Sequence, residues 1–347
     1  MKVAVWGTGN MGRAAIRIVA AHPGLELVAV VGRSKAGQDS GELADLGPNG
    51  VVIGTELPTD VDAVAYMVSG DIRPDEAVAD IAGCLRLGRV VVTPSVYALY
   101  DPTSAPAALK EPLEKAVADG GGRLFVSGID PGWGNDVLPL LVSAVAGTIE
   151  QVRSVELFDY STYDQPDAVR YSVGMGQPME EIPVMVAPGI PTMIWGGQLR
   201  MVARGLGVEL DDIVETVERR ALEHDVTNAM GLFEKGTQGG LRFEIQGIVG
   251  GKPRIVVEHV TRIDASVAPD WPSPADGGAG AHQVIIEGRP RIVVSIEATE
   301  EGGNRAAGGN ATAAARLVNA IPWLAAAAPG LYDALDVPLS PVLGKLS

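Results

Sequence analysis

The sequence predicts an α/β protein with a doubly wound parallel sheet, followed by an α+β second domain with a mixed or antiparallel sheet. Two observations predict this division. Apolar strand-like runs alternate with helix-period segments through the first 135 residues, whereas the strand-like runs beyond Pro131 are separated by hairpin-type turns. A chain of 347 residues is also long for a single core, so two domains are the natural expectation.

The first element is an apolar strand at residues 2–6, which runs into a glycine turn, then a helix ending near Val19 and a second strand at 25–31. This is the order of a Rossmann unit, whose glycines permit a tight turn, backbone approach to a pyrophosphate and close helix packing. The turn therefore predicts a dinucleotide; a flavin, another nucleotide or an empty relic of the fold are the alternatives. The predicted contacts are Gly7, Thr8, Gly9, Asn10, Met11 and Gly12.

The end of the second strand bears on which dinucleotide binds. Domains that prefer NAD carry an acidic residue there for the ribose hydroxyls, but residues 31–34 read Val-Gly-Arg-Ser. Arg33 can pair with a 2′-phosphate and Ser34 can donate to it, so the sequence favours NADP, with NAD as the alternative. A solvated Arg33 without a ligand is the other interpretation.

The alternation continues with strands and helices that complete the first domain. In such sheets, ligands bind beyond the carboxyl ends of the strands. Met67, Thr93 and Ser95 follow strand ends and are predicted to line the ribose and nicotinamide; ordinary strand ends are the alternative. The predicted strands are 62–68, 89–93 and 123–127, and the predicted helices are 75–87 and 107–119.

A glycine-rich junction, Gly128 to Asp136, precedes a helix predicted over 136–145. Its glycines let the backbone lie flat beside a nicotinamide ring, and Trp133 is placed to wall a substrate pocket. A turn followed by a helix N-cap at Asn135 or Asp136 explains the same residues.

The remaining pattern predicts the second domain and a C-terminal segment. We expect a dinucleotide-binding domain at 1–135, a substrate domain at 136–305 and a helical segment at 306–347 that packs back on the first domain. Strands are predicted at 151–159, 241–248, 254–262, 282–287 and 290–296, helices near 178–185, 189–206, 210–221 and 312–327, and an exposed loop over 268–281.

Bulk composition excludes several classes of protein. A net charge of −16 argues against a nucleic-acid partner, which would need clustered Lys and Arg. The single cysteine, Cys84, excludes an internal disulfide, and neither an export signal nor a membrane span is recognisable, so we expect a cytoplasmic protein without a membrane partner. The four histidines are scattered, and we expect no metal site.

Four motifs together resemble a known family: the glycine turn, the strand ending in Thr93, the junction 128–136 with Leu138-Pro139, and the segment 316–322. They resemble the dihydrodipicolinate-reductase-like dehydrogenases, and most closely the branch of 2,4-diaminopentanoate dehydrogenase and the native amine dehydrogenases. The resemblance implies a homodimer formed through the open sheet of the second domain. It also implies nicotinamide contacts at Asp130, where the family usually carries asparagine, and at Asn319.

In that branch, a nicotinamide cofactor reduces an imine formed from a ketone and ammonia, or oxidises a primary amine. The relatives place an ammonia-binding glutamate after the strand that ends at Thr93, but this chain has none there. Tyr97 is the candidate to orient or protonate a carbonyl oxygen, and Asp101 is the second candidate. A second-domain group, water, or a merely pocket-lining Tyr97 are the alternatives.

Aromatic residues after the junction indicate an apolar substrate, although aromatics also fill cores. The function predicted is an NAD(P)H-dependent oxidoreductase acting on a C=O or C=N group of a small, largely apolar molecule. A dinucleotide-binding sensor or scaffold without turnover is the alternative. The predicted pocket residues are Trp133, Tyr163, Tyr171 and Trp195.

Overall fold

The computed structural model describes residues 1–70, 73–162, 165–274, 278–300 and 303–341. The chain forms two compact units, one made of Met1–Trp133 with Gly309–Ser347 and the other of Gly134–Gly308. The sequence-based expectation places the boundaries after residues 135 and 305. No helix in the described ranges combines the length and the hydrophobicity that a membrane span requires.

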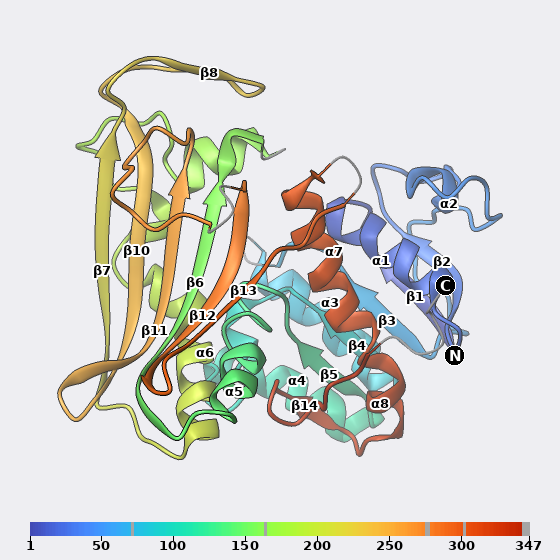
Figure 1. Cartoon of the computed structure of the whole chain (residues 1–347). Helices are drawn as coiled ribbons and strands as arrows, with labels where there is room; N and C mark the ends of the chain where they lie inside the picture. Colours follow the sequence, from blue (N-terminus) through green and yellow to red (C-terminus); the bar gives the residue numbers. More distant parts are fainter. Residues whose placement is uncertain (71–72, 163–164, 275–277, 301–302, 342–347) are drawn as a thin grey trace. The chain divides into compact units, whose positions relative to one another are not determined.

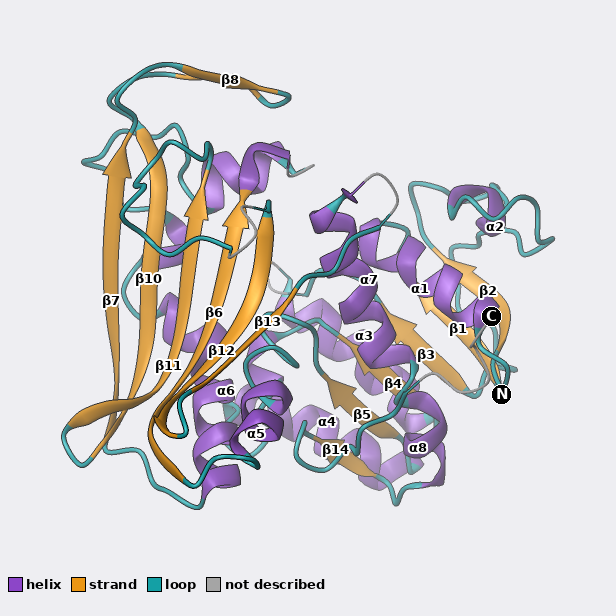
Figure 2. Cartoon of the chain, viewed as in Figure 1, coloured by secondary structure: helices purple, strands orange, loops and turns teal. Residues whose placement is uncertain are grey.

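The first unit is built on a six-stranded sheet in the order β14-β5-β4-β3-β1-β2. Every neighbouring pair is parallel, which confirms the predicted doubly wound sheet (Figure 2). The strand order reverses at β1, so the turn after β1 lies at the switch point where such sheets bind ligands. The strands are β1 (Lys2–Trp6), β2 (Glu26–Val31), β3 (Ala63–Tyr66), β4 (Val90–Thr93), β5 (Arg123–Val126) and β14 (Gly330–Tyr332), the last of which the sequence did not predict.

Helices flank this parallel sheet, and the C-terminal helices share its core (Figure 1). On one face, Val3 and Val92 pack in a buried cluster with Leu317 and Ile321. Strand side chains alternate, so intervening residues such as Val91 point to the other face, and there α3 packs against β4 and α4 against α3. The helices are α1 (Asn10–Ala21), α2 (Ser40–Leu43), α3 (Pro74–Arg86), α4 (Ala107–Gly120), α7 (Arg305–Val318) and α8 (Ile321–Ala326).

The second unit contains a six-stranded mixed sheet in the order β13-β12-β6-β11-β10-β7. β6 and β11 are parallel and the other pairs are antiparallel, as the sequence predicted for a mixed sheet. Two helices, α5 (Val137–Ser143) and α6 (Ile190–Leu206), pack against the sheet, and a hairpin extends from it. The strands are β6 (Thr148–Asp159), β7 (Asp212–Ala221), β10 (Gln238–Val249), β11 (Lys252–Arg262), β12 (Gly280–Arg289) and β13 (Ile292–Ile296), with β8 (Val226–Asn228) and β9 (Gly231–Phe233) forming the hairpin.

Four of the predicted elements differ from the structure. Residues 210–221, predicted as a helix, contain the edge strand β7, because Ile213, Val214 and Val217 fit a helical spacing but β10 supplies a full antiparallel partner. The helix predicted near 178–185 is also absent: a short 3₁₀ turn begins only at its end, at Val184–Val186, and Pro178 and Pro183 interrupt the segment.

The loop predicted as exposed over 268–281 differs from the structure in its described residues, since Trp271 is only 4% exposed and lies beside the guanidinium of Arg262, and β12 begins at Gly280. Residues 275–277 lie outside the described ranges. The single helix predicted over 312–327 is two helices, α7 and α8, separated by two residues ahead of Pro322. Proline lacks the backbone N–H that a continuous helix needs at that position.

Cys84 offers a test of this packing. Its side chain on α3 is 3% exposed, and burial raises the pKa of the thiol to about 11. On the order of one thiol in a thousand is then ionised at pH 8, and the thiolate is the reactive form. We expect the native protein to resist iodoacetamide at pH 8 and the urea-unfolded chain to react fully, as counted by mass spectrometry. Rapid native labelling would contradict the buried position.

Candidate dinucleotide-binding site

The glycine turn after β1 is held by backbone packing that leaves no room for side chains. Gly7 has a φ of +124°, and a Cβ there would lie 2.6 Å from the carbonyl oxygen of Met67. A Cβ at Gly12 would overlap the backbone of Gly7. Glycine is therefore required at both positions, first for the turn and then for the approach of α1 to it.

Gly9 differs, because no protein atom lies within 4 Å of the position its Cβ would take. It is the N-cap of α1, no side chain caps the helix, and the first turn carries no acidic residue. The unpaired N–H groups and the helix dipole of such an end favour an anion. The open space at Gly9 thus fits a diphosphate, the group that the sequence predicted for this turn.

The end of β2 brings Arg33 and Ser34 next to this turn. A Cβ at Gly32 would overlap the side chain of Thr8, so Thr8 of the glycine turn packs against the residue that precedes Arg33. Arg33 and Ser34 are exposed.

The next carboxylate along the chain, Asp39, is already engaged. Its oxygens accept backbone N–H groups of Gly41, Glu42, Asn49 and Gly50 at 2.8–3.1 Å. These bonds, that of Asn49 foremost, hold the pKa of Asp39 below its ordinary value. Asp39 therefore closes a loop of its own and is not a substitute for the missing ribose-binding acid.

Thr93 and Ser95 tie the carboxyl ends of β3 and β4 together. Thr93 donates its hydroxyl to the carbonyl of Tyr66 at 2.6 Å and accepts the backbone N–H of Ser95 at 3.0 Å. The Ser95 hydroxyl donates to the carbonyl of Val68. Their protons are thus used within the protein, so these residues shape the strand ends, and any cofactor contact from them comes from lone pairs or backbone. Met67 is joined to β1 by its N–H, 2.6 Å from the carbonyl of Trp6.

The loop after Thr93 carries both predicted proton partners. Val96 is buried with a φ of +65°, a conformation that strains a β-branched residue. Tyr97 is half-buried, with its ring centroid 6.1 Å from that of Tyr100. Asp101 is 1% exposed and accepts the hydroxyl of Thr103 at 2.6 Å, so its carboxylate also stabilises its own turn.

Tyr100, which the sequence analysis overlooked, links this loop to the junction. Its hydroxyl donates to the carbonyl of Pro94 at 3.1 Å and lies 2.9 Å from the position of a Cβ on Gly128. The junction turns tightly, with Gly132 at a φ of +134° and the Trp133 N–H bonded to the Gly128 carbonyl at 3.0 Å. Asp130 and Trp133 are half-buried.

Asn319 lies between α7 and α8. Its side-chain oxygen is buried and has no hydrogen-bond partner among the described residues. An unpaired buried acceptor is an atom that a bound ligand can complete. No described hydrogen bond joins this side chain to the glycine turn, so its predicted cofactor contact stays a prediction.

The predicted pocket aromatics of the second unit differ in burial. Trp195 is 5% exposed, and its ring contacts those of Phe243 and His259 at a tilt, with ring centroids at 5.3 and 4.4 Å. Tyr171 is 66% exposed. Tyr163 lies outside the described residues.

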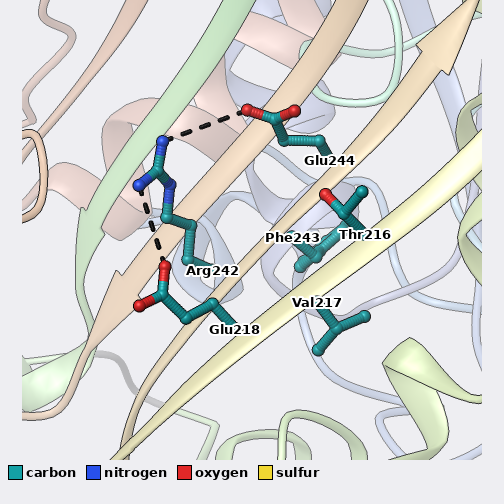
Figure 3. Close-up of a pocket in the computed structure, with 6 residues that line it drawn as sticks. All are labelled: Thr216, Val217, Glu218, Arg242, Phe243 and Glu244. Carbon is teal, nitrogen blue, oxygen red and sulfur yellow. Dashed lines mark ion pairs between the residues drawn. The ribbon is translucent and has the colours of Figure 1, made fainter.

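Trp195 of α6 packs on one face of the second sheet, and the opposite face carries a network of charged side chains. Arg242 lies between Glu218 and Glu244, and dashed lines in Figure 3 mark its ion pairs with both. Both ion pairs measure 3.9 Å, and these residues line a pocket of about 230 Å³. Arg242 also pairs with Glu258 at 2.8 Å. Burial acts to raise the pKa of Glu244, but hydrogen bonds from Arg153 and Gln246 outweigh it and hold the pKa below its ordinary value.

Comparison with known proteins identifies the family. Residues 135–345 match the 2,4-diaminopentanoate dehydrogenase C-terminal domain, and residues 1–70 match the dihydrodipicolinate reductase N-terminus. The chain is 61% identical over 353 aligned positions to the amine dehydrogenase of Streptomyces virginiae, covering 99% of this chain and 97% of that one. The chain belongs to the 2,4-diaminopentanoate dehydrogenase and amine dehydrogenase family. The resemblance predicted from its motifs is confirmed.

A more distant relative and a solved structure are also similar to this chain. The 2,4-diaminopentanoate dehydrogenase of Acetoanaerobium sticklandii is 25% identical, covering 98% of this chain and 94% of that one. The structure of amine dehydrogenase from Mycobacterium smegmatis has the same fold, with a TM-score of 0.76, 19% identity and coverage of 98% and 97%. The protein is thus an NAD(P)-dependent oxidoreductase with a dinucleotide-binding first unit.

The different surroundings of Gly9 and Gly12 generate a prediction. Gly9→Ala fills the open space and is expected to weaken dinucleotide binding at least about tenfold, roughly 1.4 kcal/mol, with little change in melting temperature. Gly12→Ala overlaps backbone and is expected to lower the melting temperature as well. Gly83→Ala, in the interior of α3 with open space around it, is the matched control: it should leave dinucleotide binding unchanged and keep or slightly raise the melting temperature. Fluorescence titration would measure dinucleotide binding, and thermal unfolding would measure the melting temperature. Unaltered binding in Gly9→Ala would contradict the position proposed for the diphosphate.

Proposed function

We propose that the protein interconverts a small, largely apolar primary amine and the corresponding carbonyl compound plus ammonia, with NADP as the preferred dinucleotide. The 61% identity to an amine dehydrogenase along nearly the whole chain carries this proposal. The open glycine turn supports it, because a cradle for a diphosphate is retained. The bound nicotinamide would accept or supply the hydride.

The residues of the first unit then have separate tasks. The N-terminus of α1 binds the diphosphate, while Thr93 and Ser95 keep the neighbouring strand ends in place. Of the two predicted proton partners, Tyr97 is better suited to orient a carbonyl oxygen, because Asp101 is buried and bonded within its loop.

The preference for NADP rests on the end of β2. Arg33 and Ser34 are exposed there, and the carboxylate of Asp39 is occupied by backbone N–H groups. A guanidinium suits a 2′-phosphate, and no acid is placed to select a free ribose hydroxyl.

A turnover assay tests the proposed function. A panel of small ketones and aldehydes is incubated with NADPH or NADH, with and without ammonium, and the loss of reduced cofactor is followed at 340 nm, the nicotinamide absorbance used for such cofactors. We expect turnover that requires ammonium and yields the primary amine. Turnover without ammonium would assign carbonyl reduction instead, and an absence of dinucleotide binding would refute the proposal.

A substitution at Arg33 tests the cofactor preference. Arg33→Ala removes a charge-assisted hydrogen bond worth about 1.5–3 kcal/mol, so the dissociation constant of NADPH is expected to rise about 10- to 100-fold while that of NADH changes little. Arg86→Ala, an exposed arginine at the end of α3, is the control. Equal losses for both cofactors would argue against a 2′-phosphate contact.

We also propose that the protein is a homodimer formed through the charged face of the second sheet. Arginines and glutamates intermingle there, so two copies related by a two-fold axis can pair opposite charges. α6 packs on the opposite face through Trp195, and among the described residues no helix covers the charged one.

Val214 allows this interface to be tested without breaking an ion pair. It is 38% exposed and shares the charged face with Gln246, its partner in register. Val214→Arg is expected to convert a dimer to a monomer of 36.0 kDa in light scattering after size exclusion. Val208→Arg is matched, because Val208 is also 38% exposed but lies after α6. A monomeric wild type, or a dimeric Val214→Arg, would refute the interface.

A further inference from the structure

One glutamate on the face of the second sheet that packs against α6 lies between two histidines. Strand pairing sets Glu156 of β6 opposite His259 of β11 on one side and His282 of β12 on the other. The Nε2 atom of His259 is 3.8 Å from a carboxylate oxygen of Glu156. Two of the four histidines in the chain thus flank a single carboxylate.

His259 is fixed in place by aromatic packing. Its ring stacks on Phe243 at 4.7 Å with an interplanar angle of 11°, and the ring of Trp195 lies 4.4 Å away. The His259 side chain is 3% exposed whereas that of Glu156 is 20% exposed. His259 is therefore held inside the unit, and the carboxylate of Glu156 is reachable by a small molecule.

Two aromatic side chains follow Glu156 in the chain, Phe158 on the same strand and Tyr160 directly after its end. Phe158 is two residues further, so it points to the same face, and its ring contacts that of Tyr160 edge-on at 5.3 Å. Both rings are half-buried. An accessible carboxylate beside partly exposed aromatic rings suits a molecule with an ammonium group on a short apolar body.

We propose that Glu156 binds the ammonium group of the amine substrate, and ammonium in the reverse direction, with His259 as its positioning residue. This inference rests on the proposed function and gives it the carboxylate that is missing after Thr93. Phe158 and Tyr160 contact the hydrocarbon part of the substrate.

The proton and electron balance is complete with an oxidised nicotinamide dinucleotide as the hydride acceptor. A proton passes from the ammonium nitrogen to a carboxylate oxygen of Glu156, which leaves the neutral amine. The nitrogen lone pair then forms the C=N bond as the hydride leaves carbon for the dinucleotide. Water adds to the iminium ion, an ammonium ion departs with formation of the carbonyl, and Glu156 releases its proton to solvent.

Glu156→Gln keeps the size of the side chain and removes its charge. We expect the KM for the amine, and for ammonium in the reductive direction, to rise about 100-fold, with an unchanged KM for the carbonyl compound and an unchanged dissociation constant for NADPH. Glu150→Gln is the matched control, because Glu150 is exposed at the start of the same strand. Glu156→Asp is expected to restore part of the loss.

A binding measurement separates this inference from the proposed function. Calorimetric titration with cyclohexylamine in the presence of NADPH, where oxidation cannot proceed, is expected to give binding to the wild type and to Glu150→Gln but not to Glu156→Gln. If the wild type turns over and Glu156→Gln keeps the wild-type KM for ammonium, the role of Glu156 is overturned while the proposed function stands. A wild type without turnover would overturn the proposed function.

The role of His259 is tested by coupling. If His259 acts through Glu156, His259→Gln raises the KM for ammonium in the wild type but adds little to Glu156→Gln. If the effects of the two substitutions on the KM for ammonium are fully additive, the positioning role of His259 is overturned. If His259→Gln fails to fold, the calorimetric titration of Glu156→Gln still decides the role of Glu156.

Discussion

The first unit depends on one close contact between backbones. The carbonyl of Gly7 meets the first turn of α1 at Gly12, and Gly7 itself lies against the end of β3 at Met67. Any side chain at these two glycines would push the helix from the strand or the turn from its neighbour. The direction of α1, and with it the direction in which its N-terminal N–H groups point, follows from this contact.

The other strand ends build outward from that contact. The hydroxyls of Thr93 and Ser95 join β4 to β3, and Tyr100 joins the loop after β4 to the junction at Gly128. Each link uses a side-chain hydroxyl to bond a backbone carbonyl at or just beyond a strand end. The result is a continuous rim of bonded loops along the carboxyl edge of the sheet, with the strained Val96 in its middle.

The parallel sheet and the glycine turn could be predicted because continuous apolar runs bounded by Gly and Pro are typical of buried parallel strands. The strand β7 could not, since Ile213 and Val217 suit a helix until the partner strand β10 is known. The site residues also divide into those that a local sequence pattern predicts and those that depend on strand pairing. The turn is local in sequence, but Glu156 and His259 are brought together only by strand pairing, and that register is not written in either segment alone.

The first unit is assembled from the two ends of the chain, with the whole second unit inserted between them. Leu317 and Ile321 complete the buried cluster on one face of its sheet, and β14 adds the last strand. During synthesis from the N-terminus, the inserted unit leaves the ribosome with all its strands while the first 133 residues still lack part of their core. The dinucleotide-binding unit, although it is translated first, therefore completes its core only when the C-terminal helices arrive.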